Sequence, residues 1–152
     1  MLQRDIRDYL EMLVQKYPSI GAIWLVGSRA AGCSRAESDW DFFVFADNNT
    51  FQAIKRDPTL HRDDIDLLVV LDGNSFEEPW GDDPKRGTLK KWRWSKVSEN
   101  EAKYVQTKWV ADEDATKRHN AKHNRELGEL GKFIDSEGKG ILTWSDSKGF
   151  VL

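Results

Sequence analysis

The sequence predicts a single α/β domain, and three observations lead to this expectation. The chain has 152 residues, a length at which one domain with one hydrophobic core is usual. Apolar residues near its start recur at three- and four-residue spacings, which is typical of an amphipathic helix. Three short apolar runs follow, each with the length of a buried β-strand. We therefore expect a core over residues 1–71 and an elaboration of that core over 72–152.

The first half of the chain gives the clearest element predictions. Its first helix ends before Pro18 and carries an apolar face made of Leu2, Ile6, Leu10, Leu13 and Tyr17. The runs 20–26 and 39–46 are predicted as the first two strands, and 65–71 as the third. A turn with helix-capping residues separates the second strand from a short helix over 51–56.

The pattern is weaker in the second half. Residues 72–87 hold Gly, Pro, Asn and acidic residues, which predict a long loop. The segments 88–97 and 104–110 carry β-branched and aromatic residues and are predicted as strands. Residues 112–135 are predicted as one long helix, because apolar residues recur there at helical spacing, namely Leu127, Leu130, Phe133 and Ile134. Two short strands are expected close to the C-terminus, at 141–142 and 150–152.

Composition narrows the classes of function. The formal net charge of −3 gives no general reason to expect a membrane or nucleic-acid partner, so any basic surface must be local. Cys33 is the single cysteine, which excludes an intrachain disulfide and favours a reducing compartment. The N-terminus lacks the pattern of a signal peptide, and no window of 18 residues is apolar throughout. We therefore expect a cytoplasmic protein without a membrane partner.

One motif carries most of the chemical information. The first predicted strand ends in Gly27-Ser28, and Asp39-Trp40-Asp41 opens the second. Side chains alternate along a strand, so Asp39 and Asp41 point the same way with Cα atoms roughly 6.5 Å apart. Two such carboxylates repel each other unless a cation lies between them, and Mg²⁺ is a natural occupant. A glycine lets backbone amides approach a phosphate closely. The motif therefore predicts metal-dependent chemistry on a nucleotide.

A third carboxylate is expected to complete this site. Asp66 is the best candidate because it lies inside the apolar third strand, where an ionised side chain is costly without a partner. Asp64 lies one pleat earlier on the same face and is the alternative. Beside the glycine, Ser28 adds a hydroxyl donor and Arg29 adds a positive charge that suits a phosphate.

These residues resemble a known family. Gly27-Ser-Arg-Ala-Ala-Gly32 followed by Ser38-Asp-Trp-Asp41 is similar to the signature of the polymerase-β-type nucleotidyltransferases, and most similar to their minimal bacterial branch. The resemblance covers about residues 1–71, and residues 72–152 match nothing that we can name. It implies a mixed β-sheet flanked by helices. It also implies transfer of a nucleoside monophosphate (NMP) from a nucleoside triphosphate (NTP) to an acceptor, with release of pyrophosphate.

The resemblance also implies roles for individual residues. Gly27 and Ser28 would hold phosphate, while Asp39 and Asp41 would bind Mg²⁺, with Mn²⁺ as an alternative ion. Asp66 would be a third metal ligand or would activate the acceptor hydroxyl. Trp40 departs from the smaller aliphatic residue usual in the family, and we expect it to pack on the opposite face of the strand. The acceptor stays open among RNA, protein and small molecules.

Two other functions stay open at this point. A catalytically inactive descendant could keep the same residues and act as a nucleotide-binding or regulatory protein, such as the antitoxin-like partner of a second protein. An RNA-binding surface could use Trp92 and Trp94, which lie among six basic residues between Lys85 and Lys96. For this segment we favour an amphipathic strand whose tryptophans pack inward while Lys91 and Arg93 face solvent.

Overall fold

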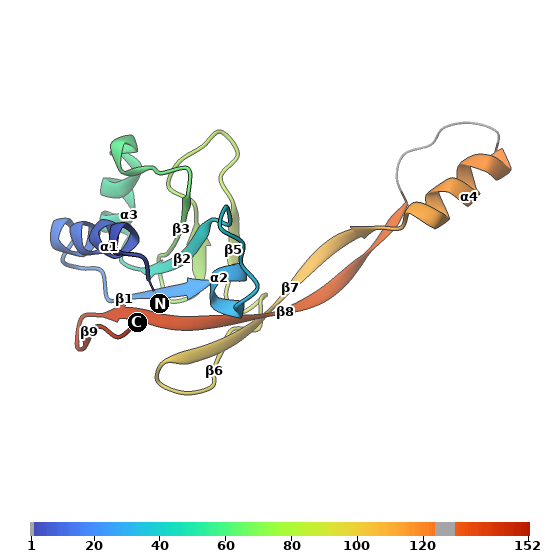
Figure 1. Ribbon diagram of the computed structural model, residues 1–152. Coiled ribbons are helices and arrows are strands. Elements are labelled where there is room, and N and C mark those ends of the chain that lie inside the picture. The colour runs from blue at the N-terminus through green and yellow to red at the C-terminus, as the bar shows by residue number, and fades with distance from the viewer. Residues whose placement is uncertain (1, 124–129) are drawn as a thin grey trace. The chain divides into compact units, whose positions relative to one another are not determined.

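The fold is mixed α+β, as the sequence predicts (Figure 1). The structure is a computed structural model that describes residues 2–123 and 130–152. Contacts divide the chain into two compact units. The first unit comprises Met1–Tyr104 with Gly138–Leu152, and the second comprises Val105–Glu137. The expected organisation of residues 1–152 as one domain stays a prediction.

The elements predicted for the first half of the chain are present, and only their ends differ by a few residues. They are α1 (Arg4–Lys16), β1 (Ala22–Val26), β2 (Trp40–Phe45), α3 (Asn48–Lys55) and β3 (Ile65–Val70). The structure adds the short helix α2 (Gly27–Ala31) and a 3₁₀ turn at Pro58–Leu60. The Asp47 side chain accepts a hydrogen bond of 2.8 Å from the Thr50 amide and so caps α3.

The later strands extend the sheet on both sides of this core. They are β4 (Ser75–Glu77), β5 (Arg86–Thr88), β6 (Ser95–Lys96), β7 (Glu101–Ala111), β8 (Gly131–Ser145) and β9 (Gly149–Phe150). Among the described residues the strand order is β5-β4-β3-β2-β1-β8-β7-β6, and β9 pairs with β8. Strand β2 is antiparallel to β1 and parallel to β3. This register sets Asp41 opposite Asp66 on one side and Val26 on the other.

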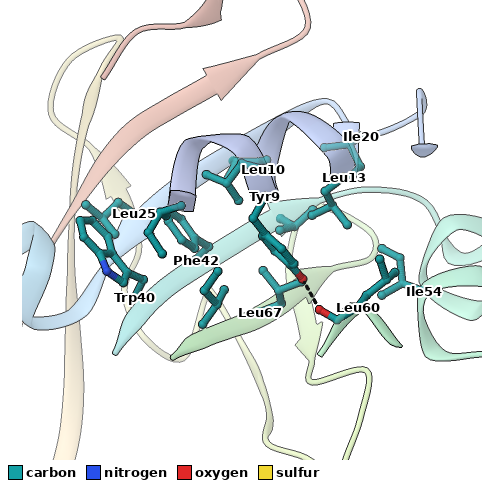
Figure 2. Close-up of a cluster of buried hydrophobic side chains, with 14 of the residues drawn as sticks. Tyr9, Leu10, Leu13, Ile20, Leu25, Trp40, Phe42, Ile54, Leu60 and Leu67 are labelled. Atoms are coloured by element: carbon teal, nitrogen blue, oxygen red, sulfur yellow. Dashed lines mark hydrogen bonds between the residues drawn. The ribbon is translucent and has the colours of Figure 1, made fainter. Parts of the chain in front are cut away.

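Side chains on the two faces of the sheet form two hydrophobic clusters. On one face, Tyr9, Leu10 and Leu13 of α1 pack against β2 and β3 (Figure 2). The Tyr9 hydroxyl donates a hydrogen bond of 2.7 Å to the Leu60 carbonyl, which Figure 2 also shows. Trp40 is buried on this face, opposite to the side chain of Asp41, as we expected. The other face is aromatic and includes Trp24, Phe43, Phe76, Trp92, Trp94 and Tyr104.

Two predictions between residues 72 and 97 need correction. The expected loop over 72–87 contains β4 and the start of β5, so it is partly a hairpin at the sheet edge. The expected strand over 88–97 is mainly a series of turns, because only its ends belong to β5 and β6. The turn includes Arg93 with φ 55°, a left-handed conformation that no strand accommodates. Its tryptophans nevertheless pack inward, as we expected.

The expected long helix over 112–135 is also wrong in part. Helix α4 covers Glu113–His123, but Phe133 and Ile134 lie on β8, with Leu130 just before it. Leu127 lies outside the described residues. Strand β7 contains the strand predicted at 104–110, and β8 contains the one predicted at 141–142. None of the helices among the described residues is long and apolar enough to span a lipid bilayer.

The second unit consists of α4 and the adjoining parts of β7 and β8. The Asp112 carboxylate accepts a hydrogen bond from the Ala115 amide at 2.9 Å and so caps α4. Trp109 fills the space over Gly131, where a Cβ would lie 2.6 Å from the indole ring. No residue of this unit whose burial is described is buried. The unit therefore lacks a hydrophobic core among the residues that the structure describes.

Candidate functional site

A tight bend connects β1 to α2 at Gly27. The glycine has φ +73°, which favours a residue without a side chain. A Cβ built on it would lie 2.2 Å from Oδ2 of Asp41. The Asp41 carboxyl group therefore lies directly against the bend. A residue other than glycine could not occupy this position unless Asp41 moved.

Asp41 and Asp66 are brought together by the parallel pairing of β2 and β3. They are register partners, both are partly exposed, and their carboxyl groups share a hydrogen bond. Burial is the largest influence on Asp41, and the hydrogen bond and charge of Asp66 act in the same direction, so that the pKa of Asp41 rises to about 7. The pair therefore retains a shared proton at pH values well above those at which carboxyl groups usually ionise.

The other two acidic candidates occupy different surroundings. Asp39 precedes β2, and its side chain is exposed, yet its negative charge still contributes to the raised pKa of Asp41. Asp64 is exposed and bound by Arg62, with hydrogen bonds of 2.6 and 2.9 Å. Asp64, the alternative candidate for the third carboxylate, is thus already paired with the guanidinium group of Arg62. Asp66 is the one that adjoins Asp41.

The donor set fits a magnesium ion through its chemistry. In the part of the chain that the structure describes, no three His, Cys, Asp or Glu side chains gather into a metal-binding group. Mg²⁺, however, is usually held by only one or two carboxylates together with substrate phosphates. Asp41 and Asp66 supply two hard carboxylates in contact with each other. Their mutual repulsion is the kind that a divalent cation relieves.

Arg29 lies beside the bend but is turned toward the following loop. Its Nη2 donates to the Ser38 carbonyl at 2.9 Å and to the Ala36 carbonyl at 3.3 Å. Its guanidinium group lies 4.4 Å from the centroid of the Trp40 ring. These contacts hold the loop that leads into β2, and the expected phosphate-binding role of Arg29 stays a prediction. Ser28 is half-buried in the bend itself.

Two residues near the carboxylates were not found by sequence reasoning. The Gly27 amide donates a hydrogen bond of 2.9 Å to the Tyr104 hydroxyl, which comes from β7. Lys85 lies close enough to lower the pKa of Asp41, and its Nζ is 5.7 Å from the centroid of the Trp92 ring. Tyr104 reaches the site through the pairing of distant strands, and Lys85 through the β4–β5 hairpin, which was expected to be a loop. The sequence pattern gave no signal for Tyr104, and it singled out Lys85 only as part of a basic segment with a different candidate role.

Trp92 and Trp94 complete the aromatic face beneath the site. The Tyr104 ring stacks on both, with centroid separations of 5.4 and 6.1 Å. Lys91 and Arg93 are exposed. The tryptophans thus contribute to the core of this face, as the amphipathic interpretation predicts.

One comparison with known proteins, a family model, agrees with the resemblance seen in the sequence. Residues 8–61 match the family model described as polymerase beta, nucleotidyltransferase. This region includes the bend and Asp41 but ends before Asp66. A crystal structure from Sulfolobus solfataricus, of a protein with a provisional nucleotidyltransferase assignment, is 14% identical with a TM-score of 0.44. The alignment covers 97% of this chain and 83% of that one. No curated protein matches the sequence.

Proposed function

We propose that this chain transfers an NMP group from an NTP to an acceptor and releases pyrophosphate. The observation that carries the proposal is the position of Asp41, which lies against the Gly27 bend and shares a hydrogen bond with Asp66. A phosphate at the bend would therefore adjoin two carboxylates. The match of residues 8–61 to a nucleotidyltransferase family model supports the same chemistry.

The chain's own residues would bind the donor nucleotide. Gly27 and Ser28 would face the phosphates, and the Lys85 ammonium would offset part of their negative charge. Asp41 and Asp66, with Asp39 nearby, would hold Mg²⁺ or Mn²⁺, which would neutralise the triphosphate and polarise the phosphorus under attack. Arg29 would act indirectly by fixing the loop that carries Asp39.

The reaction needs a group that takes the acceptor's proton. An acceptor oxygen would form a bond to the α-phosphorus, and the bond from that phosphorus to the pyrophosphate oxygen would break. The proton of the acceptor hydroxyl would pass to Asp66, which adjoins Asp41. This role requires an ionised carboxylate pair, and the raised pKa of Asp41 sets the pH range in which the shared proton is lost.

A regulatory function without turnover is the second candidate. Two observations favour it: the Gly27 amide is already hydrogen-bonded to Tyr104, and Asp39 is exposed rather than gathered with the other two carboxylates. A protein of this kind would bind a nucleotide, or a partner protein, without transferring NMP.

The test uses the full chain with each of the four NTPs, labelled at the α-phosphate, in the presence of Mg²⁺ or Mn²⁺. Binding and transfer are compared among the wild type, Asp41→Asn, Asp66→Asn and the control Asp63→Asn. Asp63 is fully exposed and precedes the paired residues of β3. Cell lysate serves as the source of acceptors, so that the labelled product identifies RNA, protein or a small molecule.

We expect the wild type and Asp63→Asn to bind nucleotide and transfer label only with the metal, and the other two variants to lose transfer. Metal-dependent binding without labelled product would favour the regulatory function. Equal transfer by Asp41→Asn and the wild type would contradict the site assignment.

A further inference from the structure

The backbone amide at the proposed phosphate position already has a hydrogen-bond acceptor. Gly27 donates to the Tyr104 hydroxyl at 2.9 Å, although the two residues lie 77 positions apart in the sequence. The Tyr104 side chain is almost completely buried, with 3% of its surface exposed. This hydroxyl oxygen therefore occupies the place at which an oxygen of a bound triphosphate would accept from the same amide.

The position of the Tyr104 ring is defined by its neighbours. Gly138 on β8 lies against it, and a Cβ at this glycine would be 2.2 Å from the ring carbon Cζ and 2.6 Å from the hydroxyl oxygen. Trp92 and Trp94 stack nearly parallel to the ring, with interplanar angles of 25° and 17°. The absence of a side chain at Gly138 thus makes the contact with Gly27 possible.

The same hydroxyl lies close to the carboxylates. The charge of Asp41 acts on Tyr104, and Asp41 also lies against Gly27. The three residues therefore form one contiguous group of amide, hydroxyl and carboxyl. A phosphate that approaches Gly27 must displace the hydroxyl oxygen, because one amide hydrogen makes only one strong, well-aligned hydrogen bond.

We propose that Tyr104 closes the phosphate seat in the free protein and that nucleotide binding requires Gly27 to exchange the Tyr104 hydroxyl for a phosphate oxygen. The inference rests on the proposed function. It makes Tyr104 a residue that sets nucleotide affinity without contacting the reacting atoms. Since the net contribution of one hydrogen bond is modest, the contact lowers the affinity about two- to tenfold.

Tyr104→Phe removes the hydroxyl and keeps the ring. Tyr9→Phe is the matched control, because Tyr9 is also buried and its hydroxyl also bonds to a backbone group, the Leu60 carbonyl, on the other face of the sheet. The dissociation constant is measured for each NTP with Mg²⁺, and for tripolyphosphate with Mg²⁺ as a probe of the phosphate seat alone.

We expect Tyr104→Phe to bind about two- to tenfold more tightly than the wild type, and Tyr9→Phe to bind like the wild type. Gly138→Ala is a second variant that disturbs the same contact, since its methyl group would overlap the Tyr104 ring and hydroxyl and so displace the hydroxyl from its position at Gly27. It should also tighten binding. Thermal unfolding of each variant confirms that the protein compared is folded.

The outcomes separate this inference from the proposed function. Unchanged or weaker binding by Tyr104→Phe, in a protein whose wild type binds nucleotide, overturns the inference and leaves the proposed function standing. If Tyr104→Phe binds the nucleotide and the wild type does not, the result supports both the inference and the proposed function. If no protein in the series binds an NTP or tripolyphosphate, the proposed function fails together with the inference.

Discussion

Asp41 is an ionisable side chain that the fold holds in unfavourable surroundings. The parallel register of β2 and β3 sets it beside Asp66, and the sheet removes part of its surface from water. Its pKa consequently rises from 3.8 to about 7, chiefly through burial. A carboxyl group whose pKa is raised in the folded protein reduces stability at every pH above its unfolded pKa, and most above its folded pKa. The carboxylate pair therefore destabilises the free protein, and a bound cation would relieve this destabilisation.

We predict that Asp41→Asn stabilises the free protein while it abolishes transfer. The amide has nearly the shape of the carboxyl group but no charge, so it removes the repulsion from Asp66. At pH 8 we expect the free energy of unfolding to rise by about 1–3 kcal/mol. Urea titration measures this change, and Asp63→Asn, at a fully exposed position, should leave stability unchanged. A less stable Asp41→Asn protein would contradict the prediction.

The stabilisation by Asp41→Asn should depend on pH in a defined direction. Between pH 4 and 7 the folded wild type retains a proton on the pair that the unfolded chain has already lost, so wild-type stability from this group falls as the pH rises. The variant has no such group. The difference in unfolding free energy should therefore be small at pH 4 and largest above pH 7. Urea titrations at pH 4, 6 and 8 test this, and a difference that is independent of pH would contradict it.

At the residue scale, local patterns located part of the site. The glycine bend and the acidic residues were predicted because their positions follow from strand alternation and short spacing. Trp40 was also placed correctly, on the opposite face from Asp41. Tyr104 was missed because only the long-range pairing of strands brings it to the bend, and Lys85 was missed because the hairpin beside it was expected to be a loop. The site roles of Gly27, Ser28, Asp39, Asp41 and Asp66 stay predictions.

At the scale of elements, periodicity succeeded where a segment packs against the sheet with one face. Helix α1 was predicted for this reason, whereas strands β1 to β3 were predicted as short apolar runs because both of their faces are buried. Periodicity failed over 112–135, because apolar residues three and four apart also occur by chance along an exposed strand. Phe133 and Ile134 lie on β8 with exposed side chains, so no buried face constrained their spacing. The prediction of a strand over 88–97 failed for a different reason. Trp92 and Trp94 both pack inward, as alternate residues of a strand would, but they do so from a turn that includes Arg93.

The β4–β5 hairpin depends on the absence of a side chain at Gly87. This residue pairs with Phe76, and a Cβ there would lie 2.5 Å from the ring carbon Cζ. The ring is fixed in the aromatic face with 2% of its surface exposed. We predict that Gly87→Ala lowers the free energy of unfolding by about 1–3 kcal/mol through overpacking.

Gly21→Ala is the matched control for this hairpin variant. The nearest atom to its Cβ, the Phe45 carbonyl oxygen, would be 4.0 Å away, which is ordinary contact. Its unfolding midpoint in urea should stay close to that of the wild type. Equal midpoints for Gly87→Ala and Gly21→Ala would show that the Phe76 ring yields to the added methyl group.

At the scale of the whole molecule, hydrophobic burial is distributed unequally between the two units. The first unit covers both faces of its sheet with large side chains, many of them fully buried. The second unit has no buried residue among those whose burial is described, and five of its large apolar side chains are exposed, namely Trp109, Val110, Leu130, Phe133 and Ile134. A two-stranded hairpin with so little burial is marginally stable in water. Local opening should therefore begin in the second unit.

We predict that trypsin cleaves the native chain first within Val105–Glu137. Exposed target residues lie on all its elements, at Lys108, Lys117, Arg118, Lys122 and Lys132. Exposure alone does not decide the order, because the turn around Lys91 is equally exposed in the first unit. That turn is anchored by Leu89, Trp92 and Trp94, which pack on the aromatic face, so its opening costs more free energy.

Mass spectrometry of the fragments from a brief digestion at low protease concentration identifies the first cuts. Under these conditions cleavage follows the population of locally open states rather than global unfolding. Gly87→Ala provides an internal comparison, since destabilising the first unit should bring cuts near Lys91 forward while the cuts at Lys117 and Lys132 keep their rate. First cleavage within residues 2–104 of the wild type would show that the exposed hairpin and α4 are held more firmly than their burial implies.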